Sequence, residues 1–547
     1  DAQTIAVVGA SDSEGSVGTL NYRLIRDWSK ALGRRVYPVN PNRDQVDGER
    51  CYPSVVDVPE DVDVAVILVS SAAGPLRDAI AKKVPFAVVF AAGFAESGEE
   101  GAARQAEIEE LVRGNEIHLL GPNTTLNAFQ PFRRDLPGKR IGLITQSGHQ
   151  GRPIYQAQEI GIPMEGWAPT GNEVDLESAD FIRWFADRPD VGVIAGYIEG
   201  FKDGRTLMLA ADHALQRGVP LVFVKSGRTE VGRSWVKTHA GHLAGSDAIM
   251  SSAFRQFGVT RVDGLDELLE VSSMFARCPP PAGDGVAIYS ISGGTCTHVA
   301  DWATAMGLRL PELTTETQER LHGWIAGYLR VSNPVDTGGH PTGDERGPKI
   351  LDAILEDPGV DILIVPVPGS FSPVSDRLAQ DLVDAAARTE KPVCVVWGSP
   401  AADEPGYRDV LLRSELPLFR SVGNCLTAVK AYLDYHGFRG RYRSPFANTV
   451  TRRLPAAKRA ARLLAGGGAL SEHRSKQVLA EYGIPVTRDI LCGSAAEAAR
   501  AARTIGSPVV MKVSSPALLH KTDLGLLRVG VRTQREVRST FAELMDR

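Results

Sequence analysis

Short runs rich in valine and isoleucine alternate along most of the chain with longer stretches in which apolar residues recur every three or four positions. The runs end in Gly, Pro, Asn or Ser, which predicts buried strands, and the stretches between them predict amphipathic helices. Strands that alternate with helices are typical of parallel sheets covered by helices. The pattern therefore predicts an α/β protein built from three successive blocks.

The first block predicts a doubly wound sheet with strands at residues 4–8, 36–39, 64–69, 86–90 and 118–120. Ligands of such sheets bind beyond the carboxyl ends of the strands. The turns that follow the strands are therefore expected to line one crevice. The candidate ligand-binding residues on these turns are Gly9, Ala10, Ser11, Val17, Gly18, Asn40, Pro41, Arg43, Ser70, Gly93, Phe94 and Asn123.

The first of these turns is rich in glycine but does not follow the GxGxxG pattern. It reads Gly9-Ala10-Ser11 and then Gly15-Ser16-Val17-Gly18, and its backbone amides are suited to a pyrophosphate. The acidic residue that holds a ribose hydroxyl of NAD is missing after the second strand, where residues 40–43 offer amides and a cation. This difference favours a ligand with an extra phosphate and counts against a Rossmann dehydrogenase.

The second and third blocks open in the same way. The second has expected strands at 140–145, 192–197 and 220–225 and a helix at 203–217; the third follows a predicted linker at 279–283, with strands at 286–290, 361–366 and 392–397. In each block the first strand leads into a Ser-Gly turn and an expected helix. Helix starts present free amide groups and the positive end of a dipole, which suit an anion. The candidate phosphate-binding residues are Ser147, Gly148, Ser292, Gly293 and Gly294.

A histidine stands among small residues in the second block, in the segment from Lys237 to Asp247. His239 is a candidate phosphate carrier, because small neighbours leave an imidazole open to attack and histidine is nucleophilic near neutral pH. The alternative is a surface loop with an incidental histidine. Two helix starts directed at one point would stabilise a phosphorylated imidazole from both sides.

Composition and charge narrow the function classes. At 547 residues the chain is long enough for three or four domains. A net charge of -5 with dispersed basic residues predicts neither nucleic-acid nor membrane-surface binding. Six isolated cysteines without CxxC spacing predict reduced thiols and no structural metal. No apolar run approaches the ~20 residues needed to cross a bilayer, so we expect a cytoplasmic protein.

Taken together, the motifs resemble the NDP-forming acyl-CoA synthetases, relatives of succinyl-CoA synthetase in which the two subunits are rearranged on one polypeptide. The similarity extends over essentially the whole chain, and several motifs in the same order make it specific. The stretches that carry it are Val7-Val8-Gly9-Ala10-Ser11, Val36-Tyr37-Pro38-Val39-Asn40-Pro41, Ala92-Gly93-Phe94-Ala95, Leu120-Gly121-Pro122-Asn123, Gln146-Ser147-Gly148, Tyr197-Ile198-Glu199-Gly200 and the His239 segment.

The resemblance implies an acid-thiol ligase that joins a carboxylic acid to CoA and converts ATP, with Mg²⁺, to ADP and phosphate. The reaction would pass through an acyl phosphate and a phosphohistidine. The implied domains are a Rossmann-like CoA-binding domain (1–130), a ligase-CoA domain with the phosphohistidine (137–278), a second flavodoxin-like ligase-CoA domain (284–445) and the first part of an ATP-grasp domain (456–547).

The resemblance also assigns roles to single residues. His239 would carry the phosphoryl group and Glu199 would orient the imidazole, with Glu173 as a competitor for that role. The twelve residues of the first-block turns would bind CoA. The two Ser-Gly turns would hold phosphate.

The last segment resembles the start of an ATP-grasp domain. Lys512, on an expected strand, would reach the nucleotide phosphates, and His520 would be a second relay histidine unless its motif is a helix-capping loop. A complete domain of this kind needs about two hundred residues. Only about ninety follow Ala456, so either the chain is truncated or a companion chain supplies the rest. The motif after His520 also lacks the family's two consecutive glycines.

The acid is not readable from the sequence. Thr124 stands where the family often has cysteine. Trp167, Trp235 and His149 offer flat faces for an aromatic acid, as in feruloyl-CoA synthetases, although packing in a core is the commoner fate of tryptophan. A homodimer or higher oligomer is expected, since relatives commonly pair. The rival function is a non-catalytic CoA-binding scaffold.

Overall fold

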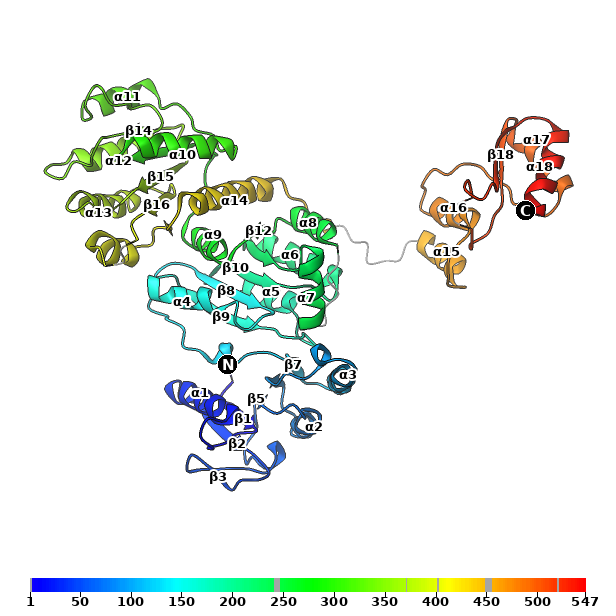
Figure 1. The fold of residues 1–547 in the computed structure, drawn as a ribbon, viewed down its shortest axis with the longest axis horizontal. Helices are drawn as coiled ribbons and strands as arrows, with labels where there is room; N and C mark the ends of the chain where they lie inside the picture. The colour runs from blue at the N-terminus through cyan, green and yellow to red at the C-terminus, as the bar shows by residue number, and fades with distance from the viewer. Residues whose placement is uncertain (1, 241–245, 370, 401–402, 448–454, 519–520) are drawn as a thin grey trace. The chain divides into compact units, whose positions relative to one another are not determined.

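The computed structural model describes residues 2–547 except 241–245, 370, 401–402, 448–454 and 519–520, and it leaves the side chains of 237–240 undescribed. The chain divides into two compact units, Asp1–Tyr442 and Arg443–Arg547, and each is described by itself (Figure 1). None of the helices in the described ranges combines the length and the apolar character needed to cross a membrane.

The first unit contains three five-stranded sheets, and the first of them has the strand order β2-β1-β5-β6-β7 with all neighbours parallel. Apolar side chains cover both faces, in agreement with the unbroken valine and isoleucine runs. The elements of this part are β1 (Thr4–Val8), α1 (Val17–Ala31), β2 (Arg35–Val39), β3 (Gln45–Val46), β4 (Glu49–Arg50), η1 (Val55–Asp57), β5 (Val64–Ile67), α2 (Ala73–Ala81), β6 (Phe86–Val89), η2 (Ala95–Ser97), α3 (Glu99–Arg113), β7 (His118–Leu120) and η3 (Asn127–Phe129).

The second sheet, in the order β12-β11-β10-β8-β9, is also parallel throughout. Its first strand in sequence, β8, lies beside its third, β10, which places a topological switch point between them. Its elements are β8 (Arg140–Thr145), α4 (Arg152–Gln156), η4 (Ala157–Ile160), β9 (Met164–Pro169), α5 (Ser178–Ala186), β10 (Val191–Ile198), α6 (Gly204–Arg217), β11 (Leu221–Lys225), α7 (Glu230–Ala240), α8 (Asp247–Gln256), β12 (Thr260–Val262) and α9 (Leu265–Arg277).

The third sheet repeats this topology in the order β14-β13-β15-β16-β17. The α/β fold class with three doubly wound sheets is confirmed. The elements of the third sheet are β13 (Val286–Ser290), α10 (Gly293–Ala305), α11 (Thr315–His322), β14 (Val335–Asp336), α12 (Arg346–Glu356), β15 (Ile362–Val367), α13 (Val374–Ala386), β16 (Val393–Trp397), η5 (Gly406–Val410), η6 (Leu411–Arg413), β17 (Leu418–Phe419) and α14 (Val422–Arg441).

The second and third sheets share one apolar core. Helices α9 and α14 lie side by side between them (Figure 1), and buried residues of both sheets belong to the same cluster. Two polar contacts reinforce the junction: the Tyr432 hydroxyl donates to the carbonyl of Pro279, and Arg277 donates to the carbonyl of Leu416 at 2.7 Å. The predicted linker at 279–283 is therefore a link in sequence and not a free hinge.

The second unit is small and has a core of its own. Its two strands pair antiparallel, and alanines of α17 pack with Val509 and Val531. Its elements are α15 (Pro455–Leu464), α16 (Glu472–Glu481), α17 (Ala495–Ile505), β18 (Val509–Lys512), β19 (Leu527–Val531) and α18 (Gln534–Asp546).

Candidate active site

The turn after β1 closes tightly on the start of α1. Gly9 has a φ of +87°, and its amide donates to the carbonyl of Val39 at 2.9 Å. A Cβ added at Gly18 would lie 2.5 Å from the Gly9 carbonyl oxygen, so only glycine fits there. Ser16 begins the helix, since its hydroxyl accepts from the amide of Thr19 at 3.1 Å. The glycine-rich turn thus brings backbone groups close to a helix start.

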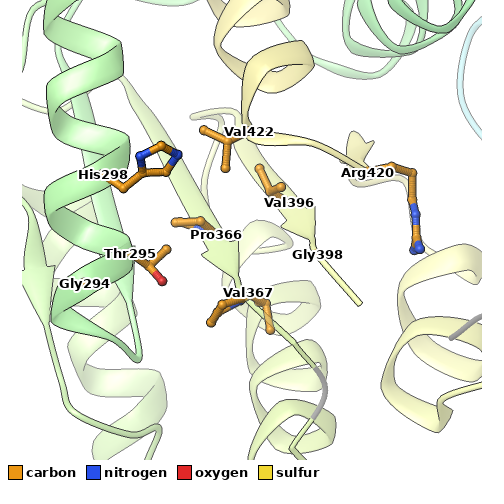
Figure 2. A pocket seen from close by; sticks show the side chains of 10 residues that line it. Gly294, Thr295, His298, Pro366, Val367, Val396, Gly398, Arg420 and Val422 are labelled. Carbon is orange, nitrogen blue, oxygen red and sulfur yellow. The ribbon is translucent and has the colours of Figure 1, made fainter. Parts of the chain in front are cut away.

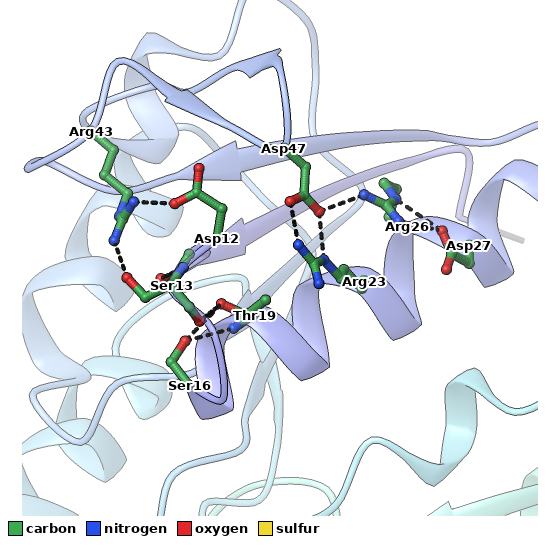
Figure 3. A network of polar contacts seen from close by, with 10 residues as sticks. Asp12, Ser13, Ser16, Thr19, Arg23, Arg26, Asp27, Arg43 and Asp47 are labelled. Atoms are coloured by element: carbon green, nitrogen blue, oxygen red, sulfur yellow. Dashed lines mark hydrogen bonds and ion pairs between the residues drawn. The ribbon is translucent and has the colours of Figure 1, made fainter.

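The turn after β2 lies against this first turn (Figure 3). The Asn40 amide donates to the carbonyl of Ala10 at 2.9 Å, while Arg43 pairs with Asp12 and donates to the Ser13 hydroxyl at 2.6 Å. The structure thus brings Asn40 and Arg43 to the glycine-rich turn, as predicted. It adds Asp12, which the sequence analysis missed and which partly neutralises the arginine.

A second polar group braces the rim of the same part (Figure 3). Asp47, beside the hairpin β3–β4, accepts from Arg23 at 2.7 Å and from Arg26 at 2.6 Å. The hydrogen bond from Arg23, followed by its charge and the contacts of Arg26, lowers the pKa of Asp47 to about 2. The hairpin is thereby tied to α1.

The turn after β6 is held by a carboxylate that the sequence analysis did not single out. Oε1 of Glu96 accepts from the amides of Gly93 at 2.6 Å and Phe94 at 3.0 Å, and Oε2 accepts from the Asn172 side chain at 2.7 Å. Asn123 in turn donates to Asn172 at 3.2 Å. Burial alone would raise the pKa of Glu96, but the hydrogen bonds from Phe94, Asn172 and Gly93 outweigh it and lower the pKa.

These contacts connect the first sheet to the loop after β9 in the second. The candidate ligand-binding residues of the first block all lie on turns at the carboxyl ends of its strands or at the start of α1. They are Gly9, Ala10, Ser11, Val17, Gly18, Asn40, Pro41, Arg43, Ser70, Gly93, Phe94 and Asn123.

The turn after β8 does not start a helix, which corrects the prediction for Ser147 and Gly148. Helix α4 begins only at Arg152 and is five residues long. The physical reason is Pro153, which lacks an amide hydrogen and is tolerated only in the first turn of a helix. Ser147 and Gly148 instead form a turn in which Gly148 closely approaches Thr125.

Gln146, just before that turn, joins the ends of β8 and β10. Its Oε1 accepts from the amides of Glu199 at 2.6 Å and Gly200 at 3.0 Å, and its Nε2 donates to the Gly200 carbonyl at 2.7 Å. Lys225, at the end of β11, donates to the Glu199 carbonyl at 2.7 Å. Glu199 is therefore a buried residue with a tightly held backbone at the carboxyl ends of three neighbouring strands.

Lys225 is itself buried. Burial, which disfavours its charge, lowers the pKa of this lysine to about 8. Its ammonium group therefore loses its proton more readily than that of an exposed lysine.

Glu173, the competitor of Glu199, is fully buried and already engaged. Its Oε1 accepts from the amide of Ser178 at 3.0 Å and from the Ser178 hydroxyl at 2.5 Å, and burial raises its pKa. These contacts hold the start of α5. Glu173 is therefore engaged at the start of α5, and the role of Glu199 as the carboxylate near the carrier stays a prediction.

His239 lies near the end of α7, but its side chain is outside the described residues, and His520 lies outside them entirely. Helix α7 follows β11, the strand that carries Lys225, and contacts η2 of the first sheet. The helix that carries the predicted phosphohistidine thus follows the strand of Lys225 in sequence and contacts the η2 segment, which contains Glu96.

The third sheet confirms its predicted helix start. Ser292 caps α10, and its hydroxyl accepts from the amide of Thr295 at 3.5 Å, which leaves Gly293 and Gly294 in the first turn. Beside them lies a cavity of about 390 Å³ at the carboxyl ends of β15 and β16 (Figure 2). Its lining, mostly apolar, includes Gly294, Thr295, His298, Pro366, Arg420 and Val422. The sequence analysis missed this cavity because its walls come from four separate segments.

The aromatic residues proposed for the acyl site do not gather there. Trp167 is buried and its Nε1 donates to the hydroxyl of Thr145 at 2.7 Å, so it belongs to the core and offers no stacking face. Trp235 and His149 are exposed. In the second unit, Lys512 is half-buried on β18 and pairs with Glu472, a partner that the sequence analysis did not name.

Three family models match the chain: a CoA binding domain over residues 3–130, a succinyl-CoA ligase like flavodoxin domain over 137–275 and an ATP-grasp domain over 461–547. The acetate–CoA ligase [ADP-forming] I of Archaeoglobus fulgidus is 30% identical over 555 residues, which cover 100% of this chain and 79% of the relative. The alpha subunit of acetate–CoA ligase [ADP-forming] II of Pyrococcus furiosus is 32% identical over 79% of this chain and 95% of its own length.

A trans-feruloyl-CoA synthase from an unknown prokaryotic organism is 28% identical over 99% of this chain and 78% of its own length. Among solved structures, the apo form of the dinucleotide forming acetyl-coenzyme A synthetase 1 of Ca. Korarchaeum cryptofilum matches with a TM-score of 0.71 and 29% identity, covering 80% of this chain and 96% of that one. Its complex with phosphate and ADP matches with a TM-score of 0.70.

Proposed function

The chain belongs to the ADP-forming acyl-CoA synthetase family, and from this premise we propose that its phosphoryl-transfer centre lies at the strand ends around Glu199. The protein is an acid-thiol ligase that uses CoA and ATP. The observation that carries the proposal is the Gln146 side chain, which holds the backbone of Glu199 with hydrogen bonds of 2.6 to 3.0 Å. The domain boundaries given above belong to the same proposal.

The proposed reaction uses His239 as a carrier. The imidazole takes the γ-phosphoryl group of ATP, with His520 as the intermediate stop, and ADP leaves. The imidazole then passes the phosphoryl group to the substrate carboxylate, which forms an acyl phosphate. The CoA thiol attacks its carbonyl carbon, the thioester forms and phosphate leaves. Mg²⁺ bound with ATP would offset the charge of the phosphates.

The residues around the carrier supply orientation and charge. Glu199 would orient the imidazole and favour its positive form, because a nearby carboxylate stabilises an imidazolium. The first turn of α10, at Gly293 and Gly294, would hold phosphate through backbone amides, and Ser147 and Gly148 would contribute from a turn. Such positioning is the main requirement of phosphoryl transfer.

The experiment is to incubate the full-length enzyme with γ-labelled ATP and to look for protein-bound label that is acid-labile and alkali-stable. His239→Ala should abolish the label. His213→Ala is the matched control, since His213 lies on α6 and only pairs with Asp187 at 3.0 Å. If thermal stabilisation by CoA persists but the full-length enzyme forms neither label nor thioester, the protein is the CoA-binding scaffold and the ligase mechanism is wrong.

We also propose that the acyl group of the carboxylic acid occupies the third-sheet cavity. Two observations support this: the cavity lies beside Gly294, and its volume of about 390 Å³ is in the range of small-molecule sites and larger than an acetyl group needs. An aromatic acid such as ferulate, the acid in the name of one relative, is a candidate. Thr295→Phe should reduce thioester formation with ferulate more than with acetate.

Thr297→Phe is the control for that substitution, because Thr297 is exposed on the same helix and does not line the cavity.

A homodimer or higher oligomer and a cytoplasmic location complete the proposal. Light scattering of the purified chain and fractionation of the cells that contain it test these two points.

A further inference from the structure

Three lysines of the second unit converge on one carboxylate. Glu472, in the first turn of α16, pairs with Lys512 of β18, lies 2.9 Å from the Nζ of Lys476 and 4.0 Å from the Nζ of Lys521. The lysines come from three different segments: α16 itself, β18 and the stretch between β18 and β19. We refer to Lys476, Lys512 and Lys521 as the lysine cluster.

Among the described residues, the ion pairs of the lysine cluster set three ammonium groups against two carboxylates, Glu472 and Asp489. Besides Glu472, Asp489 lies 3.7 Å from Lys476, but Asp489 also contacts the Nδ1 of His473 at 3.2 Å. The three lysine side chains retain only 13 to 28% of their exposed surface, so water screens them incompletely. Hydrogen bonds from Lys512 and then Lys476 lower the pKa of Glu472 to about 2.

A structural ion pair does not need this arrangement. One lysine would satisfy Glu472, and each further ammonium group repels the others. An excess of half-buried cations at one point is instead suited to a ligand with several negative charges on adjoining groups, such as the polyphosphate of a nucleotide.

We propose that Lys476 and Lys521, together with Lys512, bind the polyphosphate of the nucleotide and that Glu472 occupies the phosphate position until the nucleotide arrives. The inference rests on the proposed function for the identity of the nucleotide. It adds two phosphate-binding residues and a competing carboxylate. Binding then exchanges one anion for another at the same three ammonium groups.

The test measures the affinity of the full chain for ADP and for inorganic pyrophosphate by calorimetry. Glu472→Gln should tighten pyrophosphate binding by about fivefold to tenfold, because the competing charge is gone and a charge-assisted hydrogen bond corresponds to roughly a tenfold change. Lys476→Met and Lys521→Met should each weaken binding by about tenfold. In the wild type, affinity should fall as salt concentration rises.

Two control variants lie in the same unit. Lys458→Met removes a cation outside the cluster, and Glu481→Gln removes a carboxylate that pairs with Arg459. Both should bind pyrophosphate as the wild type does. Melting temperatures of all variants identify any that fail to fold, and Lys521→Met serves if Lys476→Met is unstable.

The proposal is overturned if the folded lysine variants bind ADP and pyrophosphate with wild-type affinity, if Glu472→Gln loses stability without gaining affinity, or if the wild type binds neither probe. Thioester formation is measured separately. A wild type that makes thioester beside lysine variants with unchanged affinity refutes this inference alone. Lysine variants that lose pyrophosphate binding in a chain without ligase activity refute the proposed function alone.

Discussion

Replacing Gln146 by leucine should disable the centre around Glu199 while leaving the fold in place. The two side chains are similar in size, so the change removes hydrogen bonds without opening a large cavity. The buried amides of Glu199 and Gly200 lose their acceptor, and the Gly200 carbonyl loses a donor.

The size of the effect follows from these three groups. A buried polar group without a partner costs about 1 to 3 kcal/mol, and a loop at a strand end relaxes to recover part of that. We therefore expect the free energy of unfolding to fall by at least about 2 kcal/mol. Misplacement of a catalytic group by about 1 Å costs roughly a hundredfold in rate, and thioester formation should fall by that order.

The assay follows thioester formation and the acid-labile label in parallel with urea unfolding. Gln158→Leu is the matched control, because Gln158 is a buried glutamine of the same part that bonds the amide of Arg133 and the carbonyl of Tyr155, remote in sequence from Glu199. It should lose stability but keep its rate. If Gln146→Leu retains the wild-type rate at a comparable loss of stability, the reasoning about Glu199 is refuted.

Three further predictions concern single positions. Gly18→Ala sets a methyl group 2.5 Å from the Gly9 carbonyl oxygen, so it should lower the free energy of unfolding by about 1 to 3 kcal/mol and abolish thermal stabilisation by CoA. Gly74→Ala is the control, because the space around Gly74 is open, and it should keep both stability and CoA binding. Unchanged CoA binding in Gly18→Ala would contradict the proposed role of the tight turn. Burial lowers the pKa of Lys225 from 10.5 to about 8, so the folded chain loses this proton at a lower pH than the unfolded chain does. The contribution of Lys225 to stability should therefore rise by up to about 3 kcal/mol between pH 8 and 10.5. Lys225→Met should remove that rise in pH-dependent melting curves, and a curve identical to that of the wild type would disprove the reasoning. Glu96→Gln should lower the melting temperature at pH 7, but the difference should vanish as the pH falls below 4.5, because hydrogen bonds hold the pKa of Glu96 below its usual value and its stabilising contribution is lost on protonation; a difference that persists in acid would show that charge is not the cause.

Local patterns predicted the central strands well. β1, β8 and β13, which have neighbours on both sides, have the bounds expected from their apolar runs, because a strand buried on both faces must be largely apolar. The strands that were missed lie at sheet edges, such as β9, β12 and β17. β9 reads Met-Glu-Gly-Trp-Ala-Pro, in which polar and turn-forming residues hide the strand pattern.

The site was predictable where one short segment determines it. The glycine-rich turn after β1 and the Ser292 cap of α10 are local features and appear as expected. The contact of Gln146 with Glu199 joins residues 53 positions apart, and that of Glu96 with Asn172 joins residues 76 apart. Only the sheet topology brings such pairs together, so no local pattern reveals them.

The shared core of the second and third sheets limits how the molecule can move. A large apolar contact between α9 and α14 resists sliding, unlike the wet and polar contacts that let domains rotate. We therefore expect the separation between Glu199 and the start of α10 to change little while the proposed reaction proceeds. Reactants would then have to diffuse between these two sites, and a higher solvent viscosity should slow that diffusion without changing the geometry of either site.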